Sequence, residues 1–383
     1  MSTKKQTLIF SIAHSYDLVF FYRLVMESNY KEKYIIKILF QEHKYFKGKM
    51  PIVNRLLLAI SDKVVYVKND QIPRHSINLV KHVFLAYKMK RLIRDNFNKK
   101  DRLLILDKSS YSSNILLSYF NRSVLFQFPE NNKDSSSYEL YILKNLLIYV
   151  YHAVINIPKI KVLKLINSKK IVEEFIVDFK NIDRVFIASD KGSRSINFST
   201  QVNASKSNKI VIFGSRYNQW NLKSSTLTKI NTYYENIYHT FKDKYLFVYI
   251  KHPLEQGSEL KEMQEVFHNS LFLETSCINS EHYLIENQDV AFCFSIGSTS
   301  SKSAYQMGFN SKVGYKWILS DTNMIPAFDN IFDDIADDIH IQTPSDDLSK
   351  TTFVSQQSTK LDALDEIIEN FSHSGYNASL NIL

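Results

Sequence analysis

The sequence predicts an α/β protein built from two Rossmann-like domains. Short apolar runs alternate with longer amphipathic stretches, and several of these runs end directly in polar or glycine-containing loops. Such alternation is the βαβ pattern of a parallel sheet covered by helices on both faces. The chain has 383 residues, of which 44% are hydrophobic, and this length exceeds the size at which a single core usually keeps growing. We therefore expect an N-terminal domain at 1–200 and a C-terminal domain at 201–383.

The first half contains short runs rich in β-branched and aromatic residues, separated by helix-like patterns. The segment 77–96 is a basic amphipathic helix in which Val80, Phe84 and Tyr87 share one face. The segment 143–170 is either a helix packed on the sheet and followed by a basic turn, or an interfacial segment that touches anionic lipid. The expected strands are 8–13, 34–40, 64–67, 103–107, 123–128 and 185–188, and the expected helices are 17–27, 77–96 and 114–120.

A polar stretch rich in Ser and Asn at 193–209 is the best candidate for a linker, and a second βαβ series follows it. The final helix at 362–371 could pack back on the N-terminal domain. The expected strands of this half are 210–213, 246–250, 290–295 and 311–315, and the expected helices are 226–241, 260–268, 300–308 and 362–371.

The net charge of +9 is unevenly distributed along the chain. Abundant Lys, Asn, Ile and Tyr with scarce Gly are also typical of an AT-rich genome, so the total charge alone indicates no partner. A local basic face suits an anionic membrane surface, an acidic glycan or nucleic acid, but we expect no nucleic acid, because no binding motif is present. The basic stretch contains Lys81, Lys88, Lys90, Arg91, Arg94, Lys99, Lys100 and Arg102, and the acidic stretch 321–347 contains eight Asp and no Lys or Arg.

The two cysteines, Cys277 and Cys293, have no metal-ligand spacing, which favours a reduced cytoplasmic setting. Lys4 and Lys5 precede a short apolar run, but His14 and Asp17 interrupt it before a signal peptide could form. The near-apolar stretch 146–157 is too short to span a bilayer. We expect a cytoplasmic protein that could bind peripherally to the inner face of a bacterial plasma membrane.

Two loops carry the chemistry of the second half. The run 246–250 leads into Lys251-His252-Pro253, and the run 290–294 leads into the segment from Ser295 to Ser301. Ligands of open α/β sheets bind at the carboxyl ends of strands. An imidazole can hydrogen-bond or protonate a phosphate, and a glycine-hydroxyl loop that opens a helix can hold one. The two loops together predict a nucleotide-sugar site.

These motifs, in this order, resemble those of the bacterial sialyltransferases of the lipooligosaccharide α-2,3-sialyltransferase type. That family shares an acidic motif, a His-Pro motif and a serine-containing motif, and the similarity covers roughly residues 100 to 310. Besides the two loops, the matching segments are Phe128-Pro129-Glu130-Asn131 with Ser135-Ser136-Ser137-Tyr138, Ile212-Phe213-Gly214-Ser215, and Ser280-Glu281-His282-Tyr283.

The resemblance implies a GT-B fold, with two Rossmann-like domains facing each other across a cleft. It also implies an inverting, metal-independent transfer of sialic acid from CMP-sialic acid to a hydroxyl of a surface glycan: lipooligosaccharide, lipopolysaccharide or capsule. Glu130 takes the position of the general base, and His252 that of a general acid or phosphate stabiliser. No cofactor and no metal are expected. The nucleotide-binding residues would be Gly214, Ser215, His252, Pro253, Ser295, Gly297, Ser298, Thr299 and Ser300.

The acidic motif departs from the family pattern, because Pro129 replaces the first acid and Asn131 replaces the glycine. Asp134 is a nearby substitute for Glu130 as the base. Two alternatives therefore stay open: a GT-B transferase with a UDP-, GDP- or CDP-linked donor, including polyol-phosphate transfer, and an inactive GT-B module that binds a glycan. The acceptor glycan, which could be lipid-linked, the linkage and the oligomeric state are not determined by the sequence.

Overall fold

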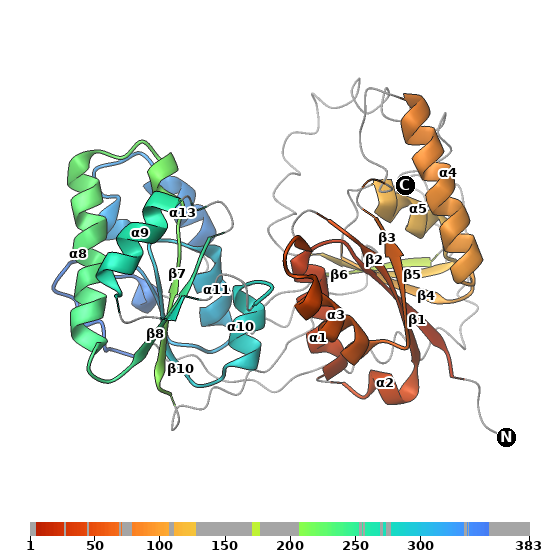
Figure 1. Ribbon diagram of the computed structural model, residues 1–383, viewed down its shortest axis with the longest axis horizontal. Helices are drawn as coiled ribbons and strands as arrows, with labels where there is room; N and C mark the ends of the chain where they lie inside the picture. Colours follow the sequence, from red (N-terminus) through yellow and green to blue (C-terminus); the bar gives the residue numbers. More distant parts are fainter. Residues whose placement is uncertain are drawn as a thin grey trace, which may run out of the picture. The chain divides into compact units, whose positions relative to one another are not determined.

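The computed structural model of the protein contains two compact units, each built around one parallel β-sheet (Figure 1). The first unit is formed mainly by residues before 199 and the second mainly by residues 199–357, with residues 45–56 grouped with the second. The structure describes residues 5–26, 28–43, 46–68, 70, 79–106, 111–127, 171–176, 207–252, 255, 257–268, 271–272, 277–332, 335 and 337–351.

The sheet of the first unit has the strand order β3-β2-β1-β4-β5-β6, and all neighbouring strands are parallel. This is the doubly wound Rossmann order, in which the order of the strands reverses between β1 and β4 while all strands stay parallel. Its inner strands are continuous apolar runs because helices cover both faces of the sheet. The strands are β1 (Thr7–Ile12), β2 (Ile35–Gln41), β3 (Lys63–Val67), β4 (Arg102–Ile105), β5 (Arg122–Gln127) and β6 (Ile171–Ile176).

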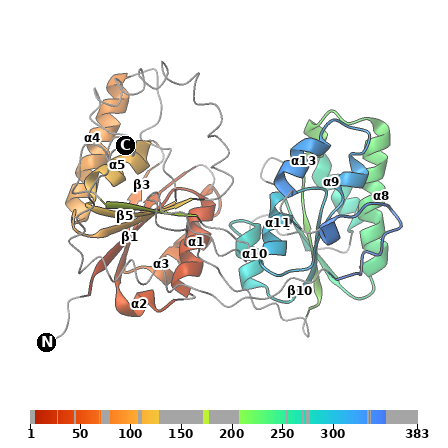
Figure 2. The same ribbon diagram turned by 180° about the vertical axis from the view of Figure 1, so that it is seen from behind.

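The helices of the first unit lie on the two faces of this sheet (Figures 1 and 2). On one face, Ile93 and Phe97 belong to the same buried cluster as Leu103 of β4. On the other face, Phe21 stacks on Phe10 of β1, with their ring centroids 4.4 Å apart. The helices are α1 (Ser15–Met26), α2 (Tyr30–Lys33), α4 (Leu79–Asn96) and α5 (Tyr111–Tyr119), whereas α3 (Met50–Ile60) belongs to both units, because its residues up to 56 group with the second.

Helix α4 forms where the sequence predicts a helix, but it buries a different face. Phe84 and Tyr87, which were expected on its apolar face, are 54% and 62% exposed. The helix buries Ala86, Met89 and Ile93 instead. These three residues form their own stripe at intervals of three and four, and it continues into the buried Phe97, so it offers the longer apolar face to the sheet.

The sheet of the second unit has the order β11-β10-β7-β8-β9, again with every neighbouring pair parallel. When the strands are numbered along the chain, this is the same Rossmann order, and the strand order reverses between β7 and β10. Its strands are β7 (Lys209–Phe213), β8 (Leu246–Ile250), β9 (Leu271–Phe272), β10 (Val290–Ser295) and β11 (Ser311–Val313). Its helices are the 3-10 helix η6 (Tyr217–Gln219), α8 (Ser224–Phe241), α9 (Gly257–Val266), α10 (Ser280–Glu286), α11 (Thr299–Gln306), α12 (Tyr315–Ile318), α13 (Ile325–Phe332) and the 3-10 helix η7 (Asp337–Ile339).

Alternate residues of the second sheet enter two different cores. Ile212 of β7 packs in a cluster with Tyr233 of α8, whereas its neighbour Phe213 packs with Leu284 of α10 and Ala304 of α11. Helices α8 and α9 accordingly lie on one face of the sheet, and α10 and α11 on the other (Figure 1). The covering of both faces explains why the strands are uniformly apolar.

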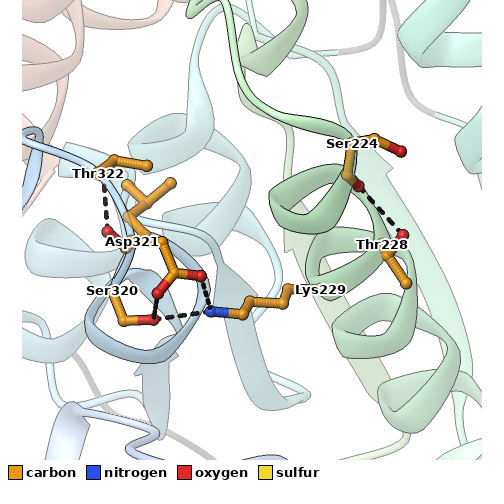
Figure 3. A network of polar contacts seen from close by, with 7 residues as sticks. Ser224, Thr228, Lys229, Ser320, Asp321 and Thr322 are labelled. Atoms are coloured by element: carbon orange, nitrogen blue, oxygen red, sulfur yellow. Dashed lines mark hydrogen bonds and ion pairs between the residues drawn. The ribbon is translucent and has the colours of Figure 1, made fainter.

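A polar contact joins α8 to the turn that follows α12 (Figure 3). Lys229 Nζ donates hydrogen bonds of 2.7 Å to Ser320 Oγ and to Asp321 Oδ2. The hydrogen bond and charge of Lys229 lower the pKa of the Asp321 carboxyl. The ion pair is near the surface and contributes little to the stability of the unit. It does, however, neutralise the charge of Lys229 with a carboxylate of the same protein.

The structure confirms the predicted α/β fold class, because it contains two consecutive Rossmann-like units, the components of a GT-B architecture. Several elements differ from the expected ones. Strands β6 and β9 and helices α2, α3, α10 and α13 were not predicted, and the strand expected at 311–315 ends at Val313 because Tyr315 already begins α12. The expected strand 185–188, the segment 143–170 and the helix 362–371 lie outside the described residues, as does most of the linker. In the described part of the chain, no helix is long and apolar enough to cross a membrane.

Candidate functional site

The reversal of the strand order between β7 and β10 in the second sheet creates the candidate site. Ile212 of β7 pairs with Phe294 of β10, and Phe213 of β7 pairs with Ile250 of β8, so these three strands end at one edge. Open α/β sheets bind their ligands outside the carboxyl ends of the strands at such a switch point. The loops that begin there are 214–216, 251–252 and 296–298. The predicted nucleotide-binding residues that the structure describes lie on these loops or at their junctions with β10 and α11.

The loop after β10 is folded around the hydroxyl of Ser295. Ser295 is fully buried; its Oγ accepts a 2.9 Å hydrogen bond from the Ser298 backbone N and lies 2.8 Å from Ser301 Oγ. Ser298 caps α11, because its Oγ accepts a 3.2 Å hydrogen bond from the Ser300 backbone N. Ser295 therefore shapes the loop. The backbone N atoms of Ser298, Ser300 and Ser301 already donate within the loop, so the exposed Thr299, with its hydroxyl and backbone N, is the residue that can meet a phosphate.

Ser300 faces a neighbouring helix. Its Oγ lies 2.6 Å from Ser280 Oγ, and Ser280 Oγ donates a 3.1 Å hydrogen bond to Glu281 Oε2. Glu281 is 2% exposed, and burial raises the pKa of its carboxyl. Through Ser280, Glu281 thus helps to position Ser300 at the start of α11. In the sequence, Ser280 and Glu281 were noted only as part of a segment that resembles the sialyltransferase family. The contact of Ser280 with Ser300 depends on how α10 packs on α11.

Gly297 is explained by the aromatic residues packed against it. A Cβ at this position would lie 2.6 Å from Phe328 Cδ1 and 3.3 Å from Tyr315 Cβ. The rings of Phe328 and Tyr315 stack with their centroids 5.3 Å apart. The motif predicts that this glycine helps the loop to hold a phosphate. In the structure, the space beside the glycine is filled by the Phe328 ring.

The loop after β8 is organised by Glu255, which sequence reasoning missed. This buried carboxylate accepts a 2.5 Å hydrogen bond from Tyr249 Oη and a 3.0 Å bond from the His252 backbone N. Burial, with the nearby charges of Tyr234 and Glu255, raises the pKa of the Tyr249 hydroxyl well above its usual range. The His252 backbone is thus anchored, and its half-buried side chain sits at the end of β8. Pro253 lies outside the described residues.

The loop after β7 begins with Gly214 and the buried Ser215. The space where Gly214 would carry a Cβ is occupied by Glu255 Oε2, Tyr249 Oη and the His252 backbone N. This brings the ends of β7 and β8 into direct contact. The next residue, Arg216, is exposed at the same edge and was not singled out from the sequence. The signal in the sequence was a basic residue directly after the Gly-Ser pair that follows a predicted strand.

The predicted base, Glu130, and its substitute, Asp134, lie outside the described residues. At the carboxyl edge of the first sheet, the structure describes another group of polar residues. The buried Asp17 holds the turn after β1, because its Oδ2 accepts from the backbone N atoms of Ala13 and His14 at 2.7 and 2.8 Å. The rings of His14 and His43 are 5.5 Å apart. These histidines follow β1 and β2, and neither belongs to a motif that predicted a site.

No group of three or more His, Cys, Asp or Glu side chains suited to a metal ion occurs among the described residues. Within the acidic stretch 321–347, Asp333 and Asp334 lie outside the described part, and Asp337 belongs to η7 with its side chain 95% exposed.

No family model matches the sequence, and no curated protein matches it significantly. Solved structures are similar in part. UDP-GlcNAc 2-epimerase from Neisseria meningitidis, bound to UDP-GlcNAc, is 11% identical with a TM-score of 0.40, over 84% of this chain and 85% of the other. MurG from Acinetobacter baumannii is 9% identical with a TM-score of 0.38, over 96% and 90% of the two chains. ADP-heptose lps heptosyltransferase II from E. coli is 9% identical with a TM-score of 0.38, over 81% and 84%. Likenesses at this level carry no argument about activity.

Proposed function

We propose that the protein is an inverting glycosyltransferase that moves sialic acid from CMP-sialic acid to a hydroxyl of a surface glycan. The main support is the switch point of the second sheet, where His252 and the N-terminus of α11 follow β8 and β10 on either side of β7. An imidazole and a helix N-terminus at one strand edge suit a phosphate leaving group. The sialyl donor itself rests on the motif resemblance described for the sequence.

In this mechanism the residues of the second unit act on the donor. The hydroxyl and backbone N of Thr299, at the positive end of the α11 dipole, would bind the donor phosphate, and the His252 imidazole would stabilise or protonate that phosphate as it leaves. The proton of the acceptor hydroxyl would pass to a carboxylate, for which Glu130 and Asp134 stay the candidates. Neither step needs a metal ion, so we expect turnover to be insensitive to EDTA.

A donor nucleotide should stabilise the protein selectively. CMP at about one hundred times its dissociation constant should add about 2.7 kcal/mol to the free energy of unfolding. For a unit of this size that corresponds to a rise of roughly 5–10 °C in Tm. Differential scanning fluorimetry with CMP, UDP, GDP and ADP checks this, and release of CMP from CMP-sialic acid with a lactose-type acceptor tests turnover. A shift with UDP, GDP or ADP in place of CMP favours the transferase with another donor. CMP binding without release favours the inactive glycan-binding module.

We also propose that α4 brings the protein to an anionic membrane surface that carries a lipid-linked acceptor. Its outer face combines exposed apolar and basic side chains. Val83, Phe84 and Tyr87 are 40%, 54% and 62% exposed, and Lys88 Nζ lies 4.5 Å from the centroid of the Phe84 ring. The side chains of Arg91 and Arg94 are also largely exposed. Aromatic and basic residues on one helix face are typical of helices that lie in the membrane interface.

Replacing Phe84 and Tyr87 by serine should therefore weaken binding to membranes. The wild-type protein should sediment with vesicles that contain phosphatidylglycerol at low salt, and much less at high salt, because salt screens the basic residues. The double variant should sediment less at low salt, whereas Leu246→Ser, which removes another exposed apolar side chain, should not change binding. Equal binding to neutral phosphatidylcholine vesicles, or an unaffected double variant, would contradict the proposal.

A further inference from the structure

Arg216 lies on the short segment between β7 and α8. One end of this segment packs against the His252 loop, and the other end packs against residues beside Gly297. At one end of the segment, Gly214 contacts Glu255 and the His252 backbone N. At the other end, the Trp220 ring meets the Phe328 ring at 5.5 Å between centroids. The Phe328 ring in turn fills the space beside Gly297. Arg216 is therefore located at the switch point, between the two loops assigned to the donor phosphate.

The backbone of this segment is held in place on both sides of Arg216. Tyr217 is buried, and its Oη donates a 2.7 Å hydrogen bond to Glu262 Oε2 on α9. The backbone O of Arg216 accepts from Gln219 N at 3.0 Å, which closes the 3-10 turn. Asn221, with φ 51°, then directs the chain toward α8 in a left-handed conformation that asparagine tolerates better than most residues. The position of Arg216 at the edge is thus fixed before any ligand arrives.

The guanidinium of Arg216 is exposed, and within the described residues it has neither an ion pair nor a side-chain hydrogen bond. Two other cations of the second unit are engaged by the protein. Lys229 pairs with Asp321 (Figure 3), and Lys302 Nζ donates to Ile331 O at 2.8 Å. A guanidinium with its five N–H donors in a planar fork matches a carboxylate or phosphate in a bidentate pair.

We propose that Arg216 binds a second anionic group of the donor, either a carboxylate on the transferred sugar or a second phosphate. The inference rests on the proposed function, in which the α11 N-terminus and His252 hold the first phosphate. Those groups already offer hydrogen bonds and a partial positive charge to one phosphate. A full, permanently charged guanidinium beside them suits a donor with one more anionic group than a nucleoside monophosphate has. Arg216 then separates donors from the spent nucleotide.

The test compares ligands that differ in that second group. Isothermal titration of CMP, CDP and CMP-sialic acid is carried out with wild type, Arg216→Gln and Arg216→Lys. Arg216→Gln should weaken the ligand with the recognised second anion by about 10- to 100-fold and leave CMP within about twofold. Arg216→Lys should recover only part of the loss, because an ammonium lacks the fork geometry. Lys244→Gln removes the same charge from the turn after α8, at the opposite edge of the sheet, and should leave all three affinities unchanged.

The result identifies the chemistry of the second group. Selective loss of CMP-sialic acid binding assigns Arg216 to the sugar carboxylate, and selective loss of CDP binding assigns it to a second phosphate. Equal weakening of CMP, or no weakening of any ligand, overturns the inference while the proposed function stands. If wild type binds none of the three ligands, the proposed function fails and this inference fails with it.

Discussion

Gly214→Ala should lower the free energy of unfolding of the second unit by about 2–4 kcal/mol. The added methyl group would overlap Glu255 Oε2 and would lie 2.7 Å from Tyr249 Oη and 2.9 Å from the His252 backbone N. All three atoms belong to one buried hydrogen-bonded group, so none can move without breaking a bond to the carboxylate. Chemical denaturation measures the loss, and Tm should fall by roughly 5–15 °C.

A double-mutant cycle identifies the cause of that loss. Glu255→Ala removes the carboxylate that the new methyl group meets, although it leaves the buried Tyr249 hydroxyl without its acceptor. In the Glu255→Ala background, the cost of Gly214→Ala should fall by at least about 1 kcal/mol. Additive costs would show that the crowding around Gly214 is not what destabilises the variant.

The Gly214→Ala variant also separates a nucleotide-binding role of this glycine from a packing role. If Gly214 lies against the nucleotide, as the motif resemblance implies, its replacement should weaken ligand binding and leave stability normal. The structure gives it a packing role against Glu255, which predicts lower stability in the absence of any ligand. Measuring both properties on one variant decides between them.

The parts of the fold that could be predicted are those encoded by local pattern. The apolar runs that became β7, β8 and β10 are continuous because helices cover both faces of the sheet, and their last residues are polar because the strands end there. The polar residues after these strand ends place His252 and Ser298 at the carboxyl edge of the second sheet. The predicted helix 300–308 begins at Thr299 for the same local reason, since Ser298 caps it.

The parts that could not be predicted depend on contacts between separate elements. Glu255 reads as a solvated acid in a turn, and only the approach of Tyr249 and His252 makes it a buried acceptor. Ser300 and Ser280 are 20 positions apart and meet because α10 packs beside α11. Likewise, α4 had two apolar stripes, and which one faced the sheet was decided by packing. Side-chain identity alone does not encode these choices.

His252→Ala should lower turnover by about 10²- to 10⁴-fold, the range typical of losing a general acid or a phosphate donor. The unfolding free energy should change by less than about 0.5 kcal/mol, because the His252 side chain is only partly buried and Glu255 binds the backbone N of His252, which alanine keeps. Release of CMP measures turnover, and the thermal unfolding curve checks stability. His268→Ala is the matched control, since His268 lies on the turn after α9, where its Nε2 is 3.0 Å from Tyr238 Oη.

His252→Gln distinguishes the two roles proposed for the imidazole. Glutamine can donate a hydrogen bond to a phosphate oxygen but cannot deliver a proton. If His252 only stabilises the departing phosphate, His252→Gln should restore a large part of the turnover lost in His252→Ala. If His252 protonates the leaving group, the glutamine variant should be nearly as slow as the alanine variant, while both keep CMP affinity within about tenfold of wild type. Wild-type turnover in His252→Ala would remove this side chain from the reaction and leave the α11 N-terminus and Arg216 as the described groups that act on the donor.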